Sequence, residues 1–480
     1  MNANVDAIKA WVRAHRDQII RSIQELIRIP TENRPPKGDE YAGQIYVKGI
    51  LEGMGAEVDM FTPDEVPELL RHPAYYPGRD YADRPNVVGV FRGSGGGRSI
   101  GFSSHMDTAS RDPLPWVISE PFSGEVKEDR LYGRGSYDMK AGLMASIWAV
   151  RAVRELGVPL RGDVIIESVV DEEWGGSNGT LAARLRGYNP DVFVIPEPSH
   201  MVVAPAHLGV RIYRLTLSGA SGMRFGGEKF DNPALGAAVV LEEIQKFAAE
   251  HHGLSLPAIY AGGDPPPVDV MAVEGRGYGV PRSCSVDFFV HFFEDDTREP
   301  APAAGAGASG QGAAGQGASV VGPGGAAPGA AGGAAPKASD KAKPLGAYTD
   351  AALEHLPASA LAVEARVKRF VDELKRHPRL SSFEIELEPL SRFVEPSSMP
   401  ADHPIVGLAC DALRALGRDA VVRGAPFACD GYVFNRYSPS KGLILGPGGA
   451  AAHAADEYVL IDDVLDLVGT YACLIAEWAG

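Results

Sequence analysis

The fold is decided by one stretch of this chain, Val164-Ile165-Ile166-Glu167-Ser168-Val169-Val170-Asp171-Glu172-Glu173-Trp174-Gly175-Gly176. Its β-branched residues are typical of a buried strand, and three acidic residues follow directly at the carboxyl end. Adjacent carboxylates are costly at one point unless solvent or a cation offsets their charge. The stretch therefore predicts a strand of an α/β sheet that ends at a cation site.

Potential metal ligands also follow other predicted strands. They are His105 and Asp107 after the strand at Ile100, Asp138 ahead of a predicted helix, Glu197 after the strand at Phe193, and His453 beyond the strand at Ile444. Ligands collect beyond the carboxyl ends of strands in open α/β sheets. Two histidines with three or more carboxylates suit zinc, cobalt or manganese better than calcium or magnesium. The sequence therefore predicts two divalent ions that share one bridging carboxylate.

Length, charge and cysteine content limit the class of protein. At 480 residues the chain is too long for one core, so at least two domains are expected. The net charge of −16 argues against general nucleic-acid binding, which needs a basic surface. The four cysteines form no CxxC pair, which favours a reducing compartment. Because the sequence also lacks a membrane-length apolar run and the apolar core of a signal peptide, we expect a cytoplasmic protein without a membrane partner.

The pattern of strands and helices changes twice along the chain. Residues 1–205 alternate strand-like and helix-like runs, as α/β proteins do, and this pattern returns over residues 396–480. Residues 206–395 instead give a β-α-β-β-α-β-like mixture, which predicts an α+β domain inserted into the first. Within it, residues 298–346 consist mainly of Gly, Ala, Pro, Ser and Gln, which predicts a flexible surface insertion.

Five motifs are distinctive in combination. They are His105-Met106-Asp107, Gly133-Arg134-Gly135-Ser136-Tyr137-Asp138-Met139-Lys140-Ala141-Gly142, Asp171-Glu172-Glu173, Glu197-Pro198 and His453-Ala454-Ala455-Asp456-Glu457-Tyr458. Together they resemble the M20 metallopeptidases over most of the chain outside residues 298–346. The resemblance implies an α/β fold with a zinc-peptidase-like catalytic domain around a central mixed sheet. It also implies that the inserted domain is a ferredoxin-like lid and the surface of a homodimer, and that the substrate is a small molecule.

The resemblance implies a role for each matching residue. Asp138 would bridge the two ions. His105 and Glu197 would complete one ion site, and the pair Glu173 and His453 would complete the other. Zinc is the metal that the resemblance favours, with cobalt or manganese as alternatives.

The neighbouring acids would divide the remaining work. Glu172 would be the general base, because it cannot take a proton from water if it is also a metal ligand. Asp107 would lie behind His105 and orient its ring, as carboxylates beside metal ligands do. Asp171 would be a structural acid.

The inserted domain departs from the family's pattern at two places. The family's carbonyl-polarising histidine is replaced by Met223, which cannot stabilise an oxyanion. The family's substrate-binding arginine corresponds to a strand that ends in His291. Either Arg224 or His291 would then bind an anionic group, or His207 would supply the electrophilic partner. Alternatively, the substrate is not an ordinary N-acyl amino acid.

These observations leave three functional hypotheses open. The first is a hydrolase that uses metal-activated water to cleave the amide C–N bond of a small, anionic N-acyl amino acid or dipeptide. The second is an aminohydrolase or amidase that acts on a non-peptide, aromatic molecule. The third is a metal-binding or partner-binding protein without catalysis, against which the spare base Glu172 argues.

Overall fold

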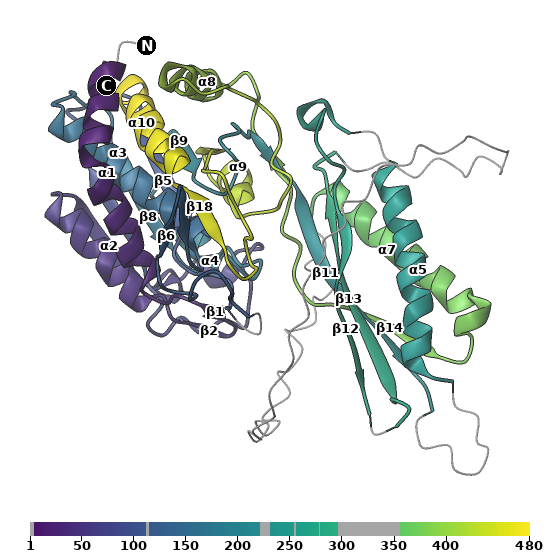
Figure 1. Cartoon of the computed structure of the whole chain (residues 1–480). Coiled ribbons are helices and arrows are strands. Elements are labelled where there is room, and N and C mark those ends of the chain that lie inside the picture. The colour runs from purple at the N-terminus through teal and green to yellow at the C-terminus, as the bar shows by residue number, and fades with distance from the viewer. Residues whose placement is uncertain (1–3, 112–114, 221–230, 254–255, 278, 296–355) are drawn as a thin grey trace, which may run out of the picture.

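The computed structural model describes residues 4–111, 115–220, 231–253, 256–277, 279–295 and 356–480. Its elements form two lobes, each built on its own sheet (Figure 1). The large sheet and its helices, here called the first lobe, are formed by segments from both ends of the chain, and the sheet β12-β13-β11-β14 with its helices is here called the second lobe. The predicted insertion at residues 298–346 lies outside the described residues, so its flexibility stays a prediction.

The first lobe is built on a mixed sheet of six strands in the order β16-β9-β5-β8-β4-β3. These strands are β3 (Glu57–Phe61), β4 (Asn86–Phe91), β5 (Ile100–His105), β8 (Val164–Val169), β9 (Val192–Ile195) and β16 (Lys441–Ile444). From β16 to β8 the neighbours are parallel, whereas β4 and β3 pair antiparallel. The carboxyl ends of β5, β8 and β9 therefore lie at one edge of the sheet, as predicted.

Helices cover both faces of this sheet. They are α1 (Val5–Ile27), α2 (Tyr41–Gly53), α3 (Ala141–Glu155), α4 (Asn178–Leu185), α8 (Pro404–Leu416), α9 (Gly431–Tyr437) and α10 (Ile461–Trp478). Successive residues of a strand point to opposite faces. Accordingly, Val164 and Ile166 belong to a core with α1, α3 and α10, while Ile165 belongs to a core with α4 and α9.

Shorter elements surround the carboxyl edge of the large sheet. One small sheet has the order β17-β18-β7-β6 and joins β6 (Val126–Lys127), β7 (Arg130–Tyr132), β17 (Gly449–Ala450) and β18 (Tyr458–Leu460). A hairpin joins β1 (Asn33–Arg34) to β2 (Lys37–Gly38), and single turns form η1 (Pro63–Glu65), η2 (Leu69–Arg71) and η3 (Ser136–Lys140). The small sheet brings the C-terminal segment, with His453 between β17 and β18, beside η3, which contains Asp138.

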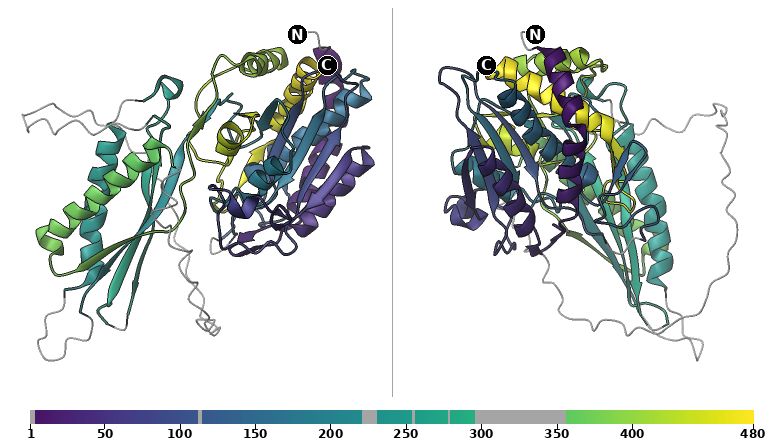
Figure 2. Two further views of the ribbon diagram at one scale, coloured as in Figure 1. Left: turned by 180° about the vertical axis from the view of Figure 1, so that it is seen from behind. Right: turned by 60° about the vertical axis from the view of Figure 1, so that its left-hand side comes forward.

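The second lobe is an antiparallel sheet with the strand order β12-β13-β11-β14. Its elements are β11 (Gly209–Ser218), β12 (Val268–Arg276), β13 (Ser283–Phe292), β14 (Glu384–Pro389), α5 (Pro233–His252), α7 (Ala358–Arg376), η4 (Ala258–Tyr260) and η5 (Pro378–Leu380). Alternate residues of β11 and β13 are buried against α5 and α7. Both helices lie on the face of the sheet that is turned away from the first lobe (Figures 1 and 2).

Two chain segments connect the lobes. The strands β10 (Ala206–His207) and β15 (Ser397–Ser398) pair antiparallel, and Val210 pairs with Val394 a few residues further on. The domain boundaries at residues 205/206 and 395/396 stay a prediction. Within the described residues, no helix is both long and apolar enough to cross a membrane.

Candidate metal centre

The first half of the candidate site gathers around His105 at the end of β5. Its ring is buried, and Nε2 lies 3.0 Å from Oδ1 of Asp138 and 3.6 Å from Oε1 of Glu197. Asp138 comes from η3 and Glu197 from the segment after β9, so three separate elements place one donor each. The arrangement depends on the parallel pairing of β5 with β9, which brings both strand ends to the same edge.

The second half of the site gathers around His453. Nε2 of this exposed residue lies 2.7 Å from Oε2 of Glu173 and 3.2 Å from Oδ2 of Asp138. The two carboxylate oxygens of Asp138 thus approach different histidines, Oδ1 toward His105 and Oδ2 toward His453. All five predicted ligands therefore meet around one carboxylate.

This donor set fits two divalent ions. Imidazole nitrogens and carboxylate oxygens are ligands that zinc, cobalt and manganese accept. In the metal-free protein, the carboxylate of Glu173 raises the pKa of His453 well above its usual range, so the cluster attracts positive charge. A divalent ion can take the place of such a proton.

The backbone of Asp138 is fixed by a residue from the other end of the chain. The carboxylate of Glu457 accepts hydrogen bonds from the backbone N–H groups of Tyr137 at 2.9 Å and Asp138 at 3.2 Å. It also accepts a bond of 2.6 Å from Nη1 of Arg134, and both members of this ion pair are buried. Glu457 belongs to a motif that the sequence identifies, but its positioning role was not predicted.

Asp107 does not orient His105 in the predicted way. Nδ1 of His105 donates to the backbone carbonyl of Asp107 at 2.7 Å, whereas the nearer carboxylate oxygen of Asp107 is 3.9 Å away. That carboxylate instead accepts from the backbone N–H groups of Glu172 at 3.0 Å and Glu173 at 3.1 Å. Because the backbone carbonyl of Asp107 already accepts from Nδ1 of His105, the Asp107 side chain is free to position residues 171–177, here called the acidic loop.

Asp171 is a structural acid in this arrangement. It is fully buried and accepts a hydrogen bond of 2.7 Å from the hydroxyl of Tyr81. Nε of Arg79 lies 3.0 Å from its carboxylate, and Arg84 is 3.8 Å away. These partners balance its charge without contact to the five ligands.

Glu172 lies close to the proposed ligands, but its carboxylate is not part of the ion pairs that join Asp138 to His105 and His453. Ligand atoms of His105, Glu172 and Glu197 lie within 4.8 Å of one another, as do those of His105, Asp138 and Glu173. Burial raises the pKa of Glu172 well above its usual range, and nearby carboxylates raise it further. A half-buried carboxyl with a raised pKa suits a group that takes up and releases a proton.

The predicted substrate contacts have different outcomes. Met223 and Arg224 lie outside the described residues, so their roles stay predictions. Nδ1 of buried His207 faces the carbonyl of Leu208 at 2.9 Å and must donate to it, while Nε2 has no hydrogen-bond partner among the described residues. Burial lowers the pKa of His207 to about 4, so Nε2 presents a lone pair rather than a proton at neutral pH. This geometry does not suit the predicted electrophilic role.

His291 lies on β13 of the second lobe, where it pairs with Val210 of β11. Burial lowers its pKa to about 4, so it is uncharged at neutral pH. A neutral imidazole is a poor partner for an anion, and this state does not support the predicted role of His291 in binding a substrate carboxylate.

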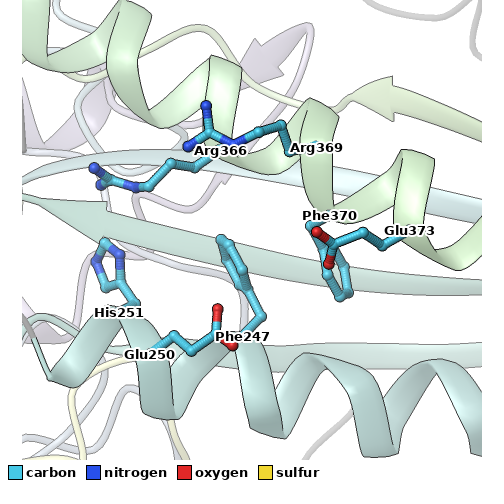
Figure 3. Close-up of a pocket in the computed structure, with 7 residues that line it drawn as sticks. All are labelled: Phe247, Glu250, His251, Arg366, Arg369, Phe370 and Glu373. Carbon is cyan, nitrogen blue, oxygen red and sulfur yellow. The ribbon is translucent and has the colours of Figure 1, made fainter. Parts of the chain in front are cut away.

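A pocket of about 80 Å³ lies in the second lobe between α5 and α7 (Figure 3). It is lined by Phe247, Glu250, His251, Arg366, Arg369, Phe370 and Glu373. Two arginines and two glutamates are among these residues, and none of the seven is a proposed metal ligand.

The family of the chain follows from its sequence. Residues 101–477 match the peptidase family M20/M25/M40, so the chain belongs to this family of hydrolases.

Curated relatives match over part of their length. An N-formyl-4-amino-5-aminomethyl-2-methylpyrimidine deformylase of Halalkalibacterium halodurans is 30% identical over 198 residues, 41% of this chain and 42% of the relative. The protein of the same name from Bacillus subtilis is 26% identical over 63% of this chain and 70% of its own length. A succinyl-diaminopimelate desuccinylase 2 of Ruegeria sp. is 32% identical over 31% of this chain and 40% of its own. The match thus spans less than half the length of two of these relatives.

Solved structures share the whole fold at low identity. Human carnosine dipeptidase 1 matches with a TM-score of 0.66 and 15% identity, covering 99% of each chain. The YXEP protein of Bacillus subtilis, described as a dinuclear metal-binding peptidase of the M20 family, matches with a TM-score of 0.56 and 12% identity. That match covers 97% of this chain and 99% of the other. The α/β fold with its central mixed sheet is therefore confirmed.

Proposed function

We propose that this chain is a hydrolase that holds two divalent ions and cleaves the C–N bond of a small, anionic substrate. The observation that carries the proposal is Asp138, whose carboxylate oxygens approach two different histidines at 3.0 and 3.2 Å. A carboxylate so placed can bridge two ions. His105 and Glu197 would complete one ion site. Glu173 and His453 would complete the other.

The residues of the acidic loop would handle the proton. When bound, the ions would lower the pKa of a water molecule and polarise a carbonyl. Glu172 would accept the proton of that water and return it to the leaving nitrogen. Asp107 would keep Glu172 in place through the backbone N–H that it accepts at 3.0 Å.

The names of the relatives support two substrate classes. The desuccinylase is named for succinyl-diaminopimelate, an N-acylated amino acid, which favours an N-acyl amino acid from the predicted class of N-acyl amino acids and dipeptides. Two of the relatives are named for an aminopyrimidine, which favours the alternative of an amidase for a non-peptide, aromatic molecule. Met223, which stands in the sequence at the place of the family's polarising histidine, supports the same alternative.

An activity screen of metal-loaded protein tests the proposal. Protein stripped of metal and reloaded with zinc, cobalt or manganese is incubated with N-formyl, N-acetyl and N-succinyl amino acids, dipeptides and aromatic formamides. We expect the zinc-loaded protein to hydrolyse one of these classes and release its carboxylic acid. This activity should be lost when a chelator removes the metal. Two bound ions per chain with no turnover on any C–N substrate would instead support a binding protein without catalysis.

The assembly and location of the chain are part of the same proposal. We propose a homodimer through the second lobe, whose edge strand β12 exposes Met271 and Val273. A dimer is favoured because an exposed apolar sheet edge invites pairing with another chain. We propose a cytoplasmic location, which the four cysteines support, since all are free and buried.

A further inference from the structure

The backbone of Arg392 belongs to the second lobe. Residues 390–394 continue the pairing of β14 with β11, since Leu390 donates to Ile212 at 2.9 Å and Val394 to Val210 at 3.0 Å. The next residue, Phe393, is buried in the second-lobe core. The segment around Arg392 is therefore hydrogen-bonded to the sheet of the second lobe, while Val394 at its end packs into a first-lobe core with Ile165.

The side chain of Arg392 is anchored in the first lobe. Nε donates to the carbonyl of Gly175 at 3.2 Å, Nη2 donates to Oγ of Ser177 at 2.6 Å, and Nη1 donates to the carbonyl of Ala74. The residue is only 2% exposed, and its guanidinium lies 5.3 Å from the ring centre of Tyr432. A planar guanidinium holds several acceptors in fixed directions, which an ammonium group cannot do.

The loop that Arg392 holds contains the proposed base. Gly175 follows Glu172 and Glu173 at a distance of three and two residues. Asp107 fixes the beginning of this loop through the N–H groups of both glutamates, and Arg392 fixes its end. Val394 of the same segment also lies near this loop, because a Cβ atom added to Gly175 would come within 3.3 Å of Cγ2 of Val394.

We propose that Arg392 is a positioning residue that couples the second lobe to Glu172. The proposal rests on the proposed function, because it gives Glu172 the role of base. Movement of the second lobe about the paired segments 206–210 and 394–398 would be transmitted through the guanidinium to the end of the acidic loop. The lobe that covers a substrate would thereby set the position of the residue that handles its proton.

Hydrogen exchange of the metal-free protein tests the coupling without any activity. Arg392→Lys keeps a positive charge but loses the planar guanidinium that donates in three directions. Ser177→Ala removes one of the acceptors. The matched control is Arg436→Met, because Arg436 spans the same junction to Glu395 at 2.8 Å and Glu294 at 3.8 Å. We expect exchange within residues 171–177 to be at least ~10-fold faster in Arg392→Lys, with a smaller rise in Ser177→Ala and no change in the control. Folded Arg392→Lys with unchanged exchange in this loop would overturn the proposal.

Kinetics of the zinc-loaded variants give a second readout. We expect kcat of Arg392→Lys to fall at least ~10-fold while KM changes less than ~3-fold, because the base is displaced but the substrate contacts remain. A rise in KM alone would contradict a role in positioning the base. If the wild-type protein hydrolyses nothing, the proposed function fails, but hydrogen exchange still decides whether Arg392 orders the loop.

Discussion

Glu172 and Glu173 are adjacent, yet their surroundings differ. Glu173 directs one oxygen to His453 at 2.7 Å and accepts the N–H of Ala109 at 2.7 Å with the other. Glu172 has no such fixed partners for its carboxylate among the described hydrogen bonds, and burial raises its pKa. The pair therefore suits two tasks, with Glu173 as ligand and Glu172 as base.

Replacing the proposed base should separate turnover from metal binding. In Glu172→Gln the amide cannot accept a proton, so kcat should fall on the order of 1,000-fold. Metal content by mass spectrometry should stay at the wild-type ratio, because the five ligands are intact. A variant with near-normal kcat would remove Glu172 from the mechanism.

His207 should make stability depend on pH. Burial lowers its pKa to about 4 from an ordinary value of about 6.5, so between these values the unfolded chain binds more protons than the folded one. The contribution of neutral His207 to the unfolding free energy is therefore complete above about pH 6.5 and is lost as the pH falls toward 4. We expect chemical unfolding to show about 2 kcal/mol less pH dependence between pH 7 and pH 5 in His207→Gln than in wild type. Exposed His252→Gln is the control, and equal slopes for His207→Gln and wild type would contradict the assignment.

At the level of single residues the sequence indicates where the proposed ligands lie, but it does not indicate their supporting contacts. His105, Glu173 and Glu197 each follow an apolar run, so the sequence indicates where they lie. The carboxylate of Asp107 turns instead toward two backbone N–H groups of a loop more than sixty residues away in the chain. This contact depends on the backbone conformation of residues 171–173, which no local sequence pattern specifies.

At the scale of elements, the site depends on how η3 is held. Asp138 lies in a short turn between β7 and α3. Its backbone N–H donates a hydrogen bond to the carboxylate of Glu457, which lies just before β18. The pairing of β18 with β7 brings these segments together. The sequence indicates both motifs but not this pairing, because the strands are three residues long and more than 300 residues apart.

Loss of the buried pair between Glu457 and Arg134 should affect both stability and metal affinity. Glu457→Gln leaves the Arg134 guanidinium buried beside a neutral group, which should cost about 3 kcal/mol of unfolding free energy. Because η3 loosens, calorimetric titration should show weaker binding of zinc.

The control for this prediction is an exposed ion pair. Arg414 and Asp411 lie 3.1 Å apart on the surface, with side chains 60% and 62% exposed. Arg414→Met should change the unfolding free energy by less than about 1 kcal/mol and leave zinc affinity unchanged. Equal effects of Glu457→Gln and Arg414→Met would contradict the special role of the buried pair.

At the scale of the molecule, the two edges of the second sheet differ. The β12 edge has Met271 and Val273 exposed, at 54% and 48% of their surface, together with the exposed acids Asp269 and Glu274. The β14 edge exposes Glu384, Glu386 and Glu388, whose charges disfavour pairing with a like strand. The β12 edge is therefore the one that suits a contact between two copies.

Charging the apolar edge should weaken the proposed dimer. We expect wild-type protein to sediment as a dimer and Val273→Lys to shift it toward monomer, because an edge lysine opposes pairing. Glu386→Lys on the opposite edge should leave the dimer intact. A wild-type monomer at all concentrations would exclude this assembly.

The changing pattern of strands predicts two domains, but it does not predict the contacts between the two sheets and their helices. Arg392 stands in the sequence Leu390-Ser391-Arg392-Phe393-Val394, which has no motif. Its role depends on the place where the second lobe meets the loop after Glu173. Only the three-dimensional arrangement shows that contact.

The central claim is that Asp138 bridges two ions while Glu172 remains free of metal. Anomalous diffraction from crystals of the zinc-loaded protein measures this directly. We expect two peaks, one on the side of His105 and one on the side of His453, with a carboxylate oxygen of Asp138 next to each. A single peak, or a peak with Glu172 as a ligand, would contradict the claim.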